Sequence, residues 1–529
     1  MKKKILLVAG MMGCGLMQAQ DIYKMEMFSG ADLNGTARFV GMGGSMGAIG
    51  ADISTMSTNP AGIGLFRRSE VSGTASLNVQ TNARDCMDRS KTKLSLDQMG
   101  FVYAVKMDDE CRFVNFGFNY RKHRNLKSYI GTSAFTDSLS QTWQMVDLTY
   151  VNGFLDLDNR DDRELTTPLT LLGYDTKMLE AQIGPDGRVT GYDAVYTQRY
   201  NYQRVQWGGV QEYDFNLSCN LSDQIFLGMT LGVYNVDLHS GVRYGESFYY
   251  PHVGDNIYPY VMEQREHMSG SGIDFKLGVI LRPFEMGSFR VGAYVHSPIF
   301  YRLKSDQYLV MESPFEDKIN NHTTLHYTKR DIDPGRNEYK LQTPWRFGLS
   351  VGGTLGGCLA LNADYEYRDY STATVRYPYT FDAFDYFDDD VKDYALEREA
   401  KNYLKGVSTI RLGLELRLPG NSYMRAGYNH ETTPFKDNAF LNQFTESSSY
   451  YYSCTTDYVN LSHLNRWTGG LGYRFGKVNL DLAYQYQHQT ARVYPFHVPT
   501  DNSDIDNRLA GQKVDLSKHQ VMLTLGYRF

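Results

Sequence analysis

The chain has 529 residues, a net charge of −6, 41 tyrosines and 49 glycines. A charge this small, without a basic stripe, argues against nucleic acid as a partner. A mean hydropathy of −0.44 excludes a bundle of membrane-spanning helices, because each span needs about 20 mostly apolar residues. A membrane protein of this composition would have to cross the bilayer with strands.

Residues 1–20 have the three parts of a secretory signal peptide. Three lysines precede an apolar run at 5–16, and Ala19 and Gln20 mark the expected cleavage region. Cys14 offers a lipoprotein cleavage box as an alternative, which the preceding methionines disfavour. We therefore expect a secreted protein that loses its leader.

Residues 21–68 do not alternate between polar and apolar side chains. Small residues dominate them, as in Gly41-Met42-Gly43-Gly44 and Asn59-Pro60-Ala61-Gly62. The first run approaches a dinucleotide-binding fingerprint, but Met46 stands where its last glycine should be and no strand precedes it. A segment of small residues can instead fold compactly inside a narrow lumen.

Period-two alternation recurs from residue 69 to the C-terminus and predicts strands with one apolar face. In one such strand, Arg411, Glu415 and Arg417 lie opposite a row of leucines. Because a charge that faces lipid is costly, we expect these three side chains in a watery lumen. The last strand alternates most regularly, with Val521, Leu523, Leu525, Tyr527 and Phe529 on its apolar face.

The connections between predicted strands alternate in length. Short ones, for example 107–111 and 221–223, are followed by long polar ones, such as 124–204 and 301–343. Outer-membrane barrels pair tight periplasmic turns with long extracellular loops in this way, and they have an even number of strands. A soluble sandwich would explain the alternation but not the segregated loops. The sequence therefore predicts an all-β fold, a transmembrane antiparallel β-barrel of about 14 strands at 69–529, with residues 21–68 as an N-terminal hatch in its lumen.

The long connection 124–204 contains helical patterns. Phe135, Leu139, Trp143 and Val146 recur at intervals of three or four residues, and a looser set follows Pro168. Amphipathic helices here would either form a groove on which a ligand lands or pack on each other as a cap. The pattern is compatible with both arrangements.

Five stretches, taken in chain order, resemble the FadL-type long-chain fatty-acid transporters of outer membranes. The run 37–62 is similar to the hatch of that family and matches its Asn-Pro-Ala motif at Asn59, Pro60 and Ala61. The resemblance covers the hatch and the C-terminal half, and it is poor in the loops and at 124–204. The other stretches include Thr343-Pro344-Trp345-Arg346-Phe347-Gly348, Leu361-Asn362-Ala363-Asp364-Tyr365, Met424-Arg425-Ala426-Gly427-Tyr428 and Gly469-Gly470-Leu471-Gly472-Tyr473.

The resemblance implies a plugged fourteen-stranded barrel that passes hydrophobic molecules without an energy source. A substrate would land in an extracellular groove, enter an apolar pocket and leave sideways through a kink in the third strand, at 112–121. Phe116, Gly117 and Phe118 are then the candidates for the lateral opening, since glycine in a strand is compatible with a kink. Asn59, Pro60 and Ala61 would face that gap, and Phe135, Leu139, Trp143 and Val146 would form the groove.

Plainer interpretations exist for each of these groups. The third strand is also compatible with an ordinary lipid-facing aromatic strand, and Asn-Pro favours a simple turn. No Arg or Lys can be selected from the sequence as the partner of a substrate carboxylate.

Sites of other chemistry are weak in this sequence. Neither H-E-x-x-H nor G-x-S-x-G occurs, so we assign no catalytic residue, no cofactor and no metal ligand, and we do not expect an enzyme. Aspartates at 382–393 would suit Ca²⁺, but EF-hand spacing is absent and a solvated loop is favoured. Cys111, Cys219 and Cys358 suit packing positions, and whether Cys86 and Cys454 pair stays open.

The function expected from the sequence is transport of long-chain fatty acids or similar hydrophobic molecules across the outer membrane of a Gram-negative bacterium. The expected partners are these molecules, outer-membrane lipid, lipopolysaccharide and the barrel-assembly machinery, which would read the strand ending at Phe529. A structural or adhesive barrel is one alternative. A haem receptor is another, with iron ligands among His252, His267, His322, His326 and Tyr327.

Overall fold

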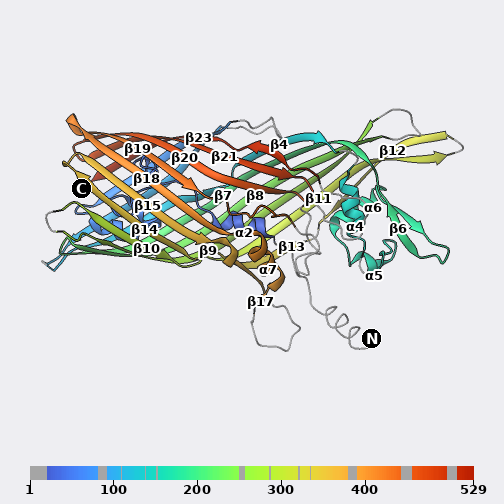
Figure 1. Ribbon diagram of the computed structural model, residues 1–529, viewed down its shortest axis with the longest axis horizontal. Helices are drawn as coiled ribbons and strands as arrows, with labels where there is room; N and C mark the ends of the chain where they lie inside the picture. The colour runs from blue at the N-terminus through green and yellow to red at the C-terminus, as the bar shows by residue number, and fades with distance from the viewer. Residues whose placement is uncertain are drawn as a thin grey trace.

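A closed barrel of fourteen antiparallel strands forms the body of the molecule (Figure 1). The computed structural model describes residues 21–81, 92–108, 110–136, 139–150, 153–249, 257–284, 287–319, 322–333, 335–378, 390–441, 456–496 and 509–529. The ring closes where β1 pairs with β23, from Glu70↔Arg528 to Gln80↔Lys518. Its members in ring order are β1 (Glu70–Gln80), β2 (Thr92–Lys106), β3 (Cys111–Asn125), β7 (Thr197–Leu221), β8 (Ile225–Tyr249), β9 (Ile257–Leu281), β10 (Arg290–His296), β14 (Arg346–Leu355), β15 (Leu359–Asp369), β18 (Gly406–Leu418), β19 (Ser422–Glu431), β20 (Tyr458–Phe475), β21 (Val478–Tyr494) and β23 (Lys518–Arg528).

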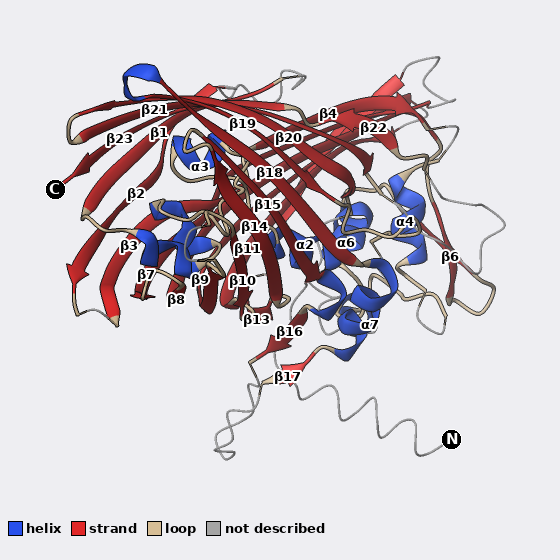
Figure 2. Cartoon of the chain, turned by 60° about the vertical axis from the view of Figure 1, so that its left-hand side comes forward, coloured by secondary structure: helices blue, strands red, loops and turns tan. Residues whose placement is uncertain are grey.

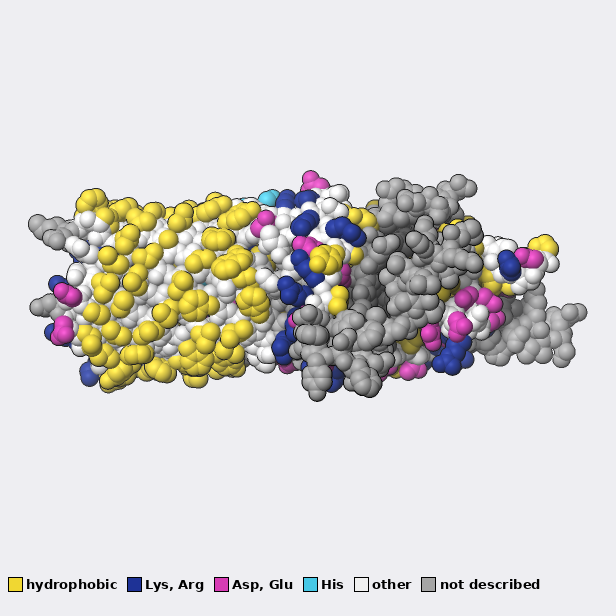
Figure 3. Space-filling view, turned by 90° about the horizontal axis from the view of Figure 1, so that it is seen from below, with side chains coloured by type: hydrophobic (Ala, Val, Ile, Leu, Met, Phe, Trp, Pro, Cys, Tyr) yellow, Lys and Arg dark blue, Asp and Glu magenta, His cyan; other side chains and the backbone are white. Residues whose placement is uncertain are grey.

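The alternation of the sequence becomes the two faces of the barrel wall. In β23, Val521 and Leu523 point outward and are nearly half exposed, whereas Met522 and Thr524 are buried in the lumen. In β8 the outward residues from Ile225 to Val233 are all apolar, and about nine residues of tilted strand suffice to cross a bilayer core. Figure 3 shows the resulting hydrophobic side chains over one end of the molecule, on the face in view. None of the described helices is long and apolar enough to span a membrane.

The wall extends well beyond this band on the side of the long connections. β7, β8 and β9 each have 25 residues, more than twice what a bilayer requires. The sequence predicts loops at 124–204 and 301–343, which contain part of this region, because a strand that meets water on both faces lacks an apolar stripe. The extension also contains β4 (Ser128–Phe135), β11 (Phe300–Ile319), β12 (His322–Ile332), β13 (Arg336–Gln342), β16 (Thr374–Tyr377), β17 (Val391–Lys392) and β22 (Gln512–Asp515).

A small cap lies at the far end of this extension (Figure 1). The predicted helix through Phe135 and Val146 is shorter than expected, since Phe135 ends β4 and the helix begins only after its N-cap, Ser140. The cap elements are α4 (Gln141–Asp147), α5 (Arg160–Arg163), α6 (Pro168–Asp175), β5 (Glu180–Ile183) and β6 (Val189–Asp193). Three further helices lie outside the cap: η3 (Tyr370–Thr372), α7 (Tyr394–Tyr403) and η4 (Pro419–Asn421).

The hatch occupies the lumen, as the sequence predicts, and Figure 2 shows its short helices enclosed by strands. Its elements are α2 (Ile22–Ser29), α3 (Ala37–Gly41), η1 (Ile53–Ser57) and η2 (Pro60–Leu65). Each begins on a side chain that accepts a hydrogen bond from the first turn: Asp21, Thr36, Asp52 and Asn59. Such caps stabilise helices too short to persist alone. Residues 1–20, Cys86 and Cys454 lie outside the described residues.

Candidate substrate site in the barrel lumen

The Asn-Pro-Ala motif of the hatch lies flat against a glycine patch of the wall. A Cβ atom on Gly228 of β8 would lie 2.3 Å from the backbone of Pro60, and one on Gly278 of β9 would lie 2.1 Å from Asn59 Oδ1. A Cβ on Gly292 of β10 would lie 2.5 Å from Gly47 O of the hatch. The motif therefore lies against β8, β9 and β10, and Asn216 of β7 donates to Pro60 O at 3.4 Å. Each glycine occupies a lumen-facing position of its strand, but which strands face the motif depends on the three-dimensional fold.

Asn59 is fully buried and connects three pieces of backbone. Its Oδ1 accepts from Ala61 N at 3.2 Å, and its Nδ2 donates to Gly47 O at 2.7 Å and to Val279 O at 3.2 Å. The first bond caps η2, the second holds the hatch together, and the third ties the hatch to β9. Asn59 is thus a positioning residue of the plug.

We expect Asn59→Asp to loosen the hatch without unfolding the barrel. Aspartate keeps the cap on Ala61 but cannot donate to the two carbonyls, and each buried acceptor left unpaired costs about 1–3 kcal/mol. Amide hydrogen exchange at 47–62 should accelerate at least tenfold. Asn235→Asp on the outer face of β8 is the matched control, and equal exchange in both variants would contradict this role.

The third strand is regular at the predicted opening. Phe116 and Phe118 lie on its outer face, and the pairing with β2 and with β7 passes through Gly117 without interruption. A Cβ on Gly117 would meet the tip of Met56 at 2.1 Å. The glycine therefore makes room for a hatch side chain, and neither ladder shows a register shift at this position.

The backbone ladder between β2 and β3 ends farther along the same strand, where the Lys122 side chain still contacts Ser95 and lies 3.8 Å from Asp97. Pairing of β2 with β3 ends at Gln98↔Arg121, although β2 starts at Thr92 and β3 continues to Asn125. Among the described residues, no backbone pairing joins 92–97 to β3, and the β3–β7 register shifts between Lys122 and Arg124. We call this break, between 92–97 and 122–125, the β2–β3 slit. Leu94 and Leu96 are exposed beside it, so it lies within the apolar band.

A cavity of about 190 Å³ lies in the lumen between α2 and the wall. Arg124 and Asn125 at the end of the slit help to line it. A second cavity of about 50 Å³ shares Asn125 and Lys518 with the first and reaches Gln80 of β1. We call them the upper and the lower cavity. The upper cavity is lined by apolar residues, including Leu126, Ile130, Val242, Val459 and Leu461, and by charged residues of both signs. The cations are Lys24, Arg124, Arg204, Arg466 and Lys518, and the carboxylates are Asp21, Glu26, Asp32, Glu266, Glu431 and Asp457.

Most of these cations already have anionic neighbours. Arg124 contacts Glu26 at 3.1 Å, Arg204 contacts Asp457 at 3.1 Å, and Arg466 lies 3.6 Å from Glu431. Lys518 differs, because its Nζ donates to the carbonyl oxygen of Lys127 at 2.9 Å and has no carboxylate partner within the part of the chain that the structure describes. It is the best-placed cation for a ligand carboxylate, and the sequence alone gave no signal for it.

Apolar side chains connect the cap to the upper cavity. One buried cluster joins Met145 and Leu169 of the cap to Ile130 and Val459. A second surrounds α2 and α7 and includes Leu126. Leu461 packs against both clusters and lines the cavity. Hydrophobic surface is therefore continuous from the outer cap to the hatch.

The residues predicted to form a landing groove are divided between surface and core. Val146 is buried in the cap cluster and Leu139 packs against it. Phe135 is 72% exposed, and the Trp143 ring lies 5.4 Å from that of Tyr196. Since α4 and α6 pack on each other, the described structure has the cap arrangement.

The cap should dock more weakly as pH rises. Burial raises the pKa of Glu246, which accepts from Ser140 Oγ at 2.5 Å and Gln141 N at 2.8 Å, to about 7. Burial also raises the pKa of Asp147 in α4 to about 7. Exposed carboxyls release their protons near pH 4, so the docked cap binds more protons than the undocked one between about pH 4 and pH 7, and docking weakens as pH rises through that window.

Hydrogen exchange at 141–147, corrected for intrinsic rates, measures this effect. We expect more protection at about pH 5 than at about pH 8, and a smaller difference in Glu246→Gln, which stays neutral. The exposed Glu263→Gln serves as the control. An unchanged pH response in the Glu246 variant would refute the assignment.

A buried ion network lies on the lumen face of the wall. Arg411 pairs with Glu366 at 3.1 Å, and Glu415 pairs with Arg425 at 2.6 Å and with Arg38 of the hatch at 2.9 Å. These contacts confirm the lumen position predicted for Arg411 and Glu415. A second group centres on Lys276 of β9, which contacts Glu212 and Asp214.

Comparisons with known proteins give structural likenesses only. No family model matches the chain, and no curated protein matches it. The Ralstonia pickettii toluene transporter TbuX is similar at 14% identity, over 94% of this chain and 99% of its own, with a TM-score of 0.47. A Pseudomonas aeruginosa FadL homologue is similar at 13% identity, over 94% of this chain and 99% of its own, with a TM-score of 0.49. The P. putida toluene transporter TodX is similar at 10% identity, over 94% of this chain and 99% of its own, with a TM-score of 0.45. The barrel itself is established by the strand pairing, independently of these likenesses.

Proposed function

We propose that this protein carries long-chain fatty acids or similar hydrophobic molecules across the outer membrane of a Gram-negative bacterium, as FadL-type transporters do. The observation that carries the proposal is the β2–β3 slit beside a lumen cavity in a barrel plugged by its own N-terminal segment. A hydrophobic solute prefers hydrocarbon to water by about 25 cal/mol per Å². A sideways exit into the bilayer would spare it an aqueous path.

The proposed route follows the apolar clusters inward. A molecule enters between cap and wall, passes Leu461 into the upper cavity, crosses to the lower cavity near Lys518 and leaves through the slit. Ligand pockets usually enclose about 300–1,000 Å³, so the upper cavity, at about 190 Å³, accepts only part of a long chain. The remainder would extend toward the slit, and the hatch motif would gate the route indirectly by fixing the plug.

The fatty-acid part of the proposal rests on Lys518. A carboxylate would gain a charge-assisted hydrogen bond from its Nζ, whereas toluene would gain nothing. We expect Lys518→Met to reduce uptake of labelled oleate several-fold and to leave toluene uptake unchanged. An equal loss of oleate and toluene uptake would mean that Lys518 has a structural role. Unchanged oleate uptake would mean that Lys518 does not bind the substrate.

Cells with and without the gene provide the first test, through uptake of labelled oleate. Deletion should lower uptake, and Asn59→Ala and Gly117→Val should lower it in the restored strain. Unchanged uptake after deletion would end the fatty-acid proposal. The chain would then be tested with neutral hydrocarbons.

Cross-linking tests the exit. The side chains of Ser95 and Lys122 touch across the slit, so Ser95→Cys with Lys122→Cys, in a background without other cysteines, can be joined by a bifunctional thiol reagent. We expect the cross-link to block oleate uptake. Tyr103→Cys with Phe116→Cys joins the same two strands where their ladder is closed and should have no effect. Full uptake through a cross-linked slit would exclude this exit.

The proposal includes further partners. Lipopolysaccharide would surround the outer half of the barrel, and the barrel-assembly machinery would read the last strand, whose terminal Phe529 is exposed on the outer face.

A further inference from the structure

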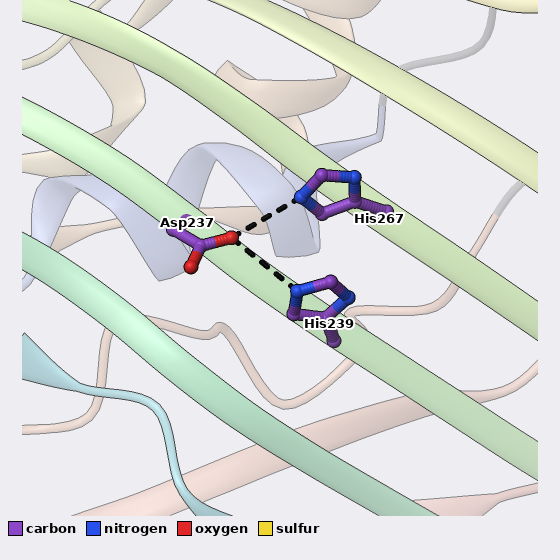
Figure 4. Close-up of side chains that lie close together, drawn as sticks. All are labelled: Asp237, His239 and His267. Atoms are coloured by element: carbon purple, nitrogen blue, oxygen red, sulfur yellow. Dashed lines mark hydrogen bonds and ion pairs between the residues drawn. The ribbon is translucent and has the colours of Figure 1, made fainter.

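Two histidines and an aspartate gather on the outer face of the wall, beyond the apolar band. Asp237 and His239 lie two residues apart on β8 and therefore on one face, and His267 is the cross-strand partner of His239 on β9. In Figure 4 both rings lie beside the Asp237 carboxylate. The side chain of Asp237 is 55% exposed, that of His239 34% and that of His267 42%.

The distances among the donor atoms fit a shared cation. Asp237 Oδ1 lies 3.1 Å from His267 Nε2 and 3.4 Å from His239 Nε2, and the ligand atoms all lie within 4.8 Å of one another. Metal–ligand bonds of about 2.0–2.2 Å place neighbouring donors of a tetrahedral site about 3.3–3.6 Å apart, and those of an octahedral site about 0.5 Å closer. A direct hydrogen bond explains only the shorter contact, because 3.4 Å is long for one.

We propose that Asp237, His239 and His267 bind a divalent transition-metal ion of the Zn²⁺ and Cu²⁺ class. Two imidazoles and one carboxylate are ligands that such ions prefer, whereas Ca²⁺ and Mg²⁺ prefer oxygen alone. Three protein ligands leave at least one coordination position open, and the exposure of the cluster directs that position to the outside. The ion would join β8 to β9 where the wall leaves the bilayer.

The surroundings limit how the rings can move. The rings of His239 and His267 stack with centroids 4.2 Å apart and an interplanar angle of 4°, and Trp207 stacks on His239 at 5.1 Å. Parallel rings do not aim at one point, so each must turn about χ2 to bind a common ion. That torsion is broad, and turning the rings would separate the stack of Trp207, His239 and His267.

This cluster differs from the haem ligands that the sequence suggested. His267 was one of those candidates, but its neighbours here are His239 and Asp237. Two side-by-side imidazoles on adjacent strands cannot take the opposite axial positions of one haem. The cross-strand register brings residues 28 positions apart together, which is why no sequence spacing revealed the cluster.

Calorimetry with Zn²⁺ and electron paramagnetic resonance with Cu²⁺ test the inference on purified full-length protein carrying no polyhistidine tag. We expect one saturable site with nitrogen hyperfine coupling, and at least a tenfold loss of affinity in His239→Gln, His267→Gln and Asp237→Asn. His463→Gln is the matched control, because His463 stacks on His430 at 5.6 Å outside any metal-ligand group of the described chain.

Three results would overturn the proposal. They are the absence of saturable binding, equal binding by all variants, and a loss in the control that matches the loss in the triad variants. None of them bears on fatty-acid transport, which rests on the slit and the cavities.

Discussion

Gly228→Ala should dislodge the hatch from the wall. The added Cβ would lie 2.3 Å from the carbonyl carbon of Pro60 and 2.4 Å from Ala61 N, and real Cβ atoms do not approach backbone so closely. Displacing either the β8 ladder or the capped turn of η2 would cost substantial free energy. Overpacking usually costs about 1–3 kcal/mol, and contact with backbone on both sides places this variant at or above the upper end. We expect faster hydrogen exchange at 47–66 and a new ion conductance in planar bilayers.

Two other glycines provide the controls. Gly73→Ala in β1 adds a methyl group that meets no atom within 4 Å and should leave both measurements unchanged. Gly117→Ala meets only the flexible tip of Met56 and should have a small effect. The glycine patch would not be what holds the hatch in place if Gly228→Ala changed neither hydrogen exchange nor conductance. The same would follow if Gly117→Ala changed them as much as Gly228→Ala.

Lys276→Met should be among the most destabilising substitutions in the barrel. Lys276 is 1% exposed and lies among three buried carboxylates: Asp214 at 2.5 Å, Asp274 at 3.7 Å, and Glu212 in direct contact. Arg121 and His123 also contact Glu212, but removing the central ammonium leaves uncompensated charge. Breaking a buried pair typically costs about 3–5 kcal/mol. The transition temperature of heat-modifiable gel migration should fall accordingly.

Lys304→Met is the matched control for this change. Lys304 contacts Glu338 at 2.5 Å with both side chains about half exposed, and exposed pairs contribute about 0–1 kcal/mol. Adding Asp214→Asn to Lys276→Met should restore part of the loss, because Asp214 pairs with Lys276, whereas Glu212 keeps Arg121 and His123 as partners. Equal transition temperatures for the two lysine variants would refute a stabilising network.

Local patterns predicted the architecture well because alternation and loop length are properties of the chain itself. The outward row that begins at Val521, the lumen positions of Arg411 and Glu415, and the hatch at 21–68 all follow from side-chain size and polarity. The same logic failed where water covers both faces of a strand. The stretch 301–343 therefore predicts a loop where β11, β12 and β13 lie, and the helix predicted from Phe135 is too long.

The candidate site was decided by contacts between residues far apart in the sequence. Gly117 suggested a kink, but only the tertiary structure shows that it accommodates Met56 and that the β2–β3 ladder ends at Gln98↔Arg121. Likewise, Asn59 could be recognised as part of a motif, yet its glycine seat is assembled from three strands. Side-chain periodicity determines which face a residue takes, whereas strand register and the packing of the plug determine which residues meet. The sequence by itself therefore established a plugged membrane barrel, and the tertiary structure located its cavities, its slit and the histidine cluster.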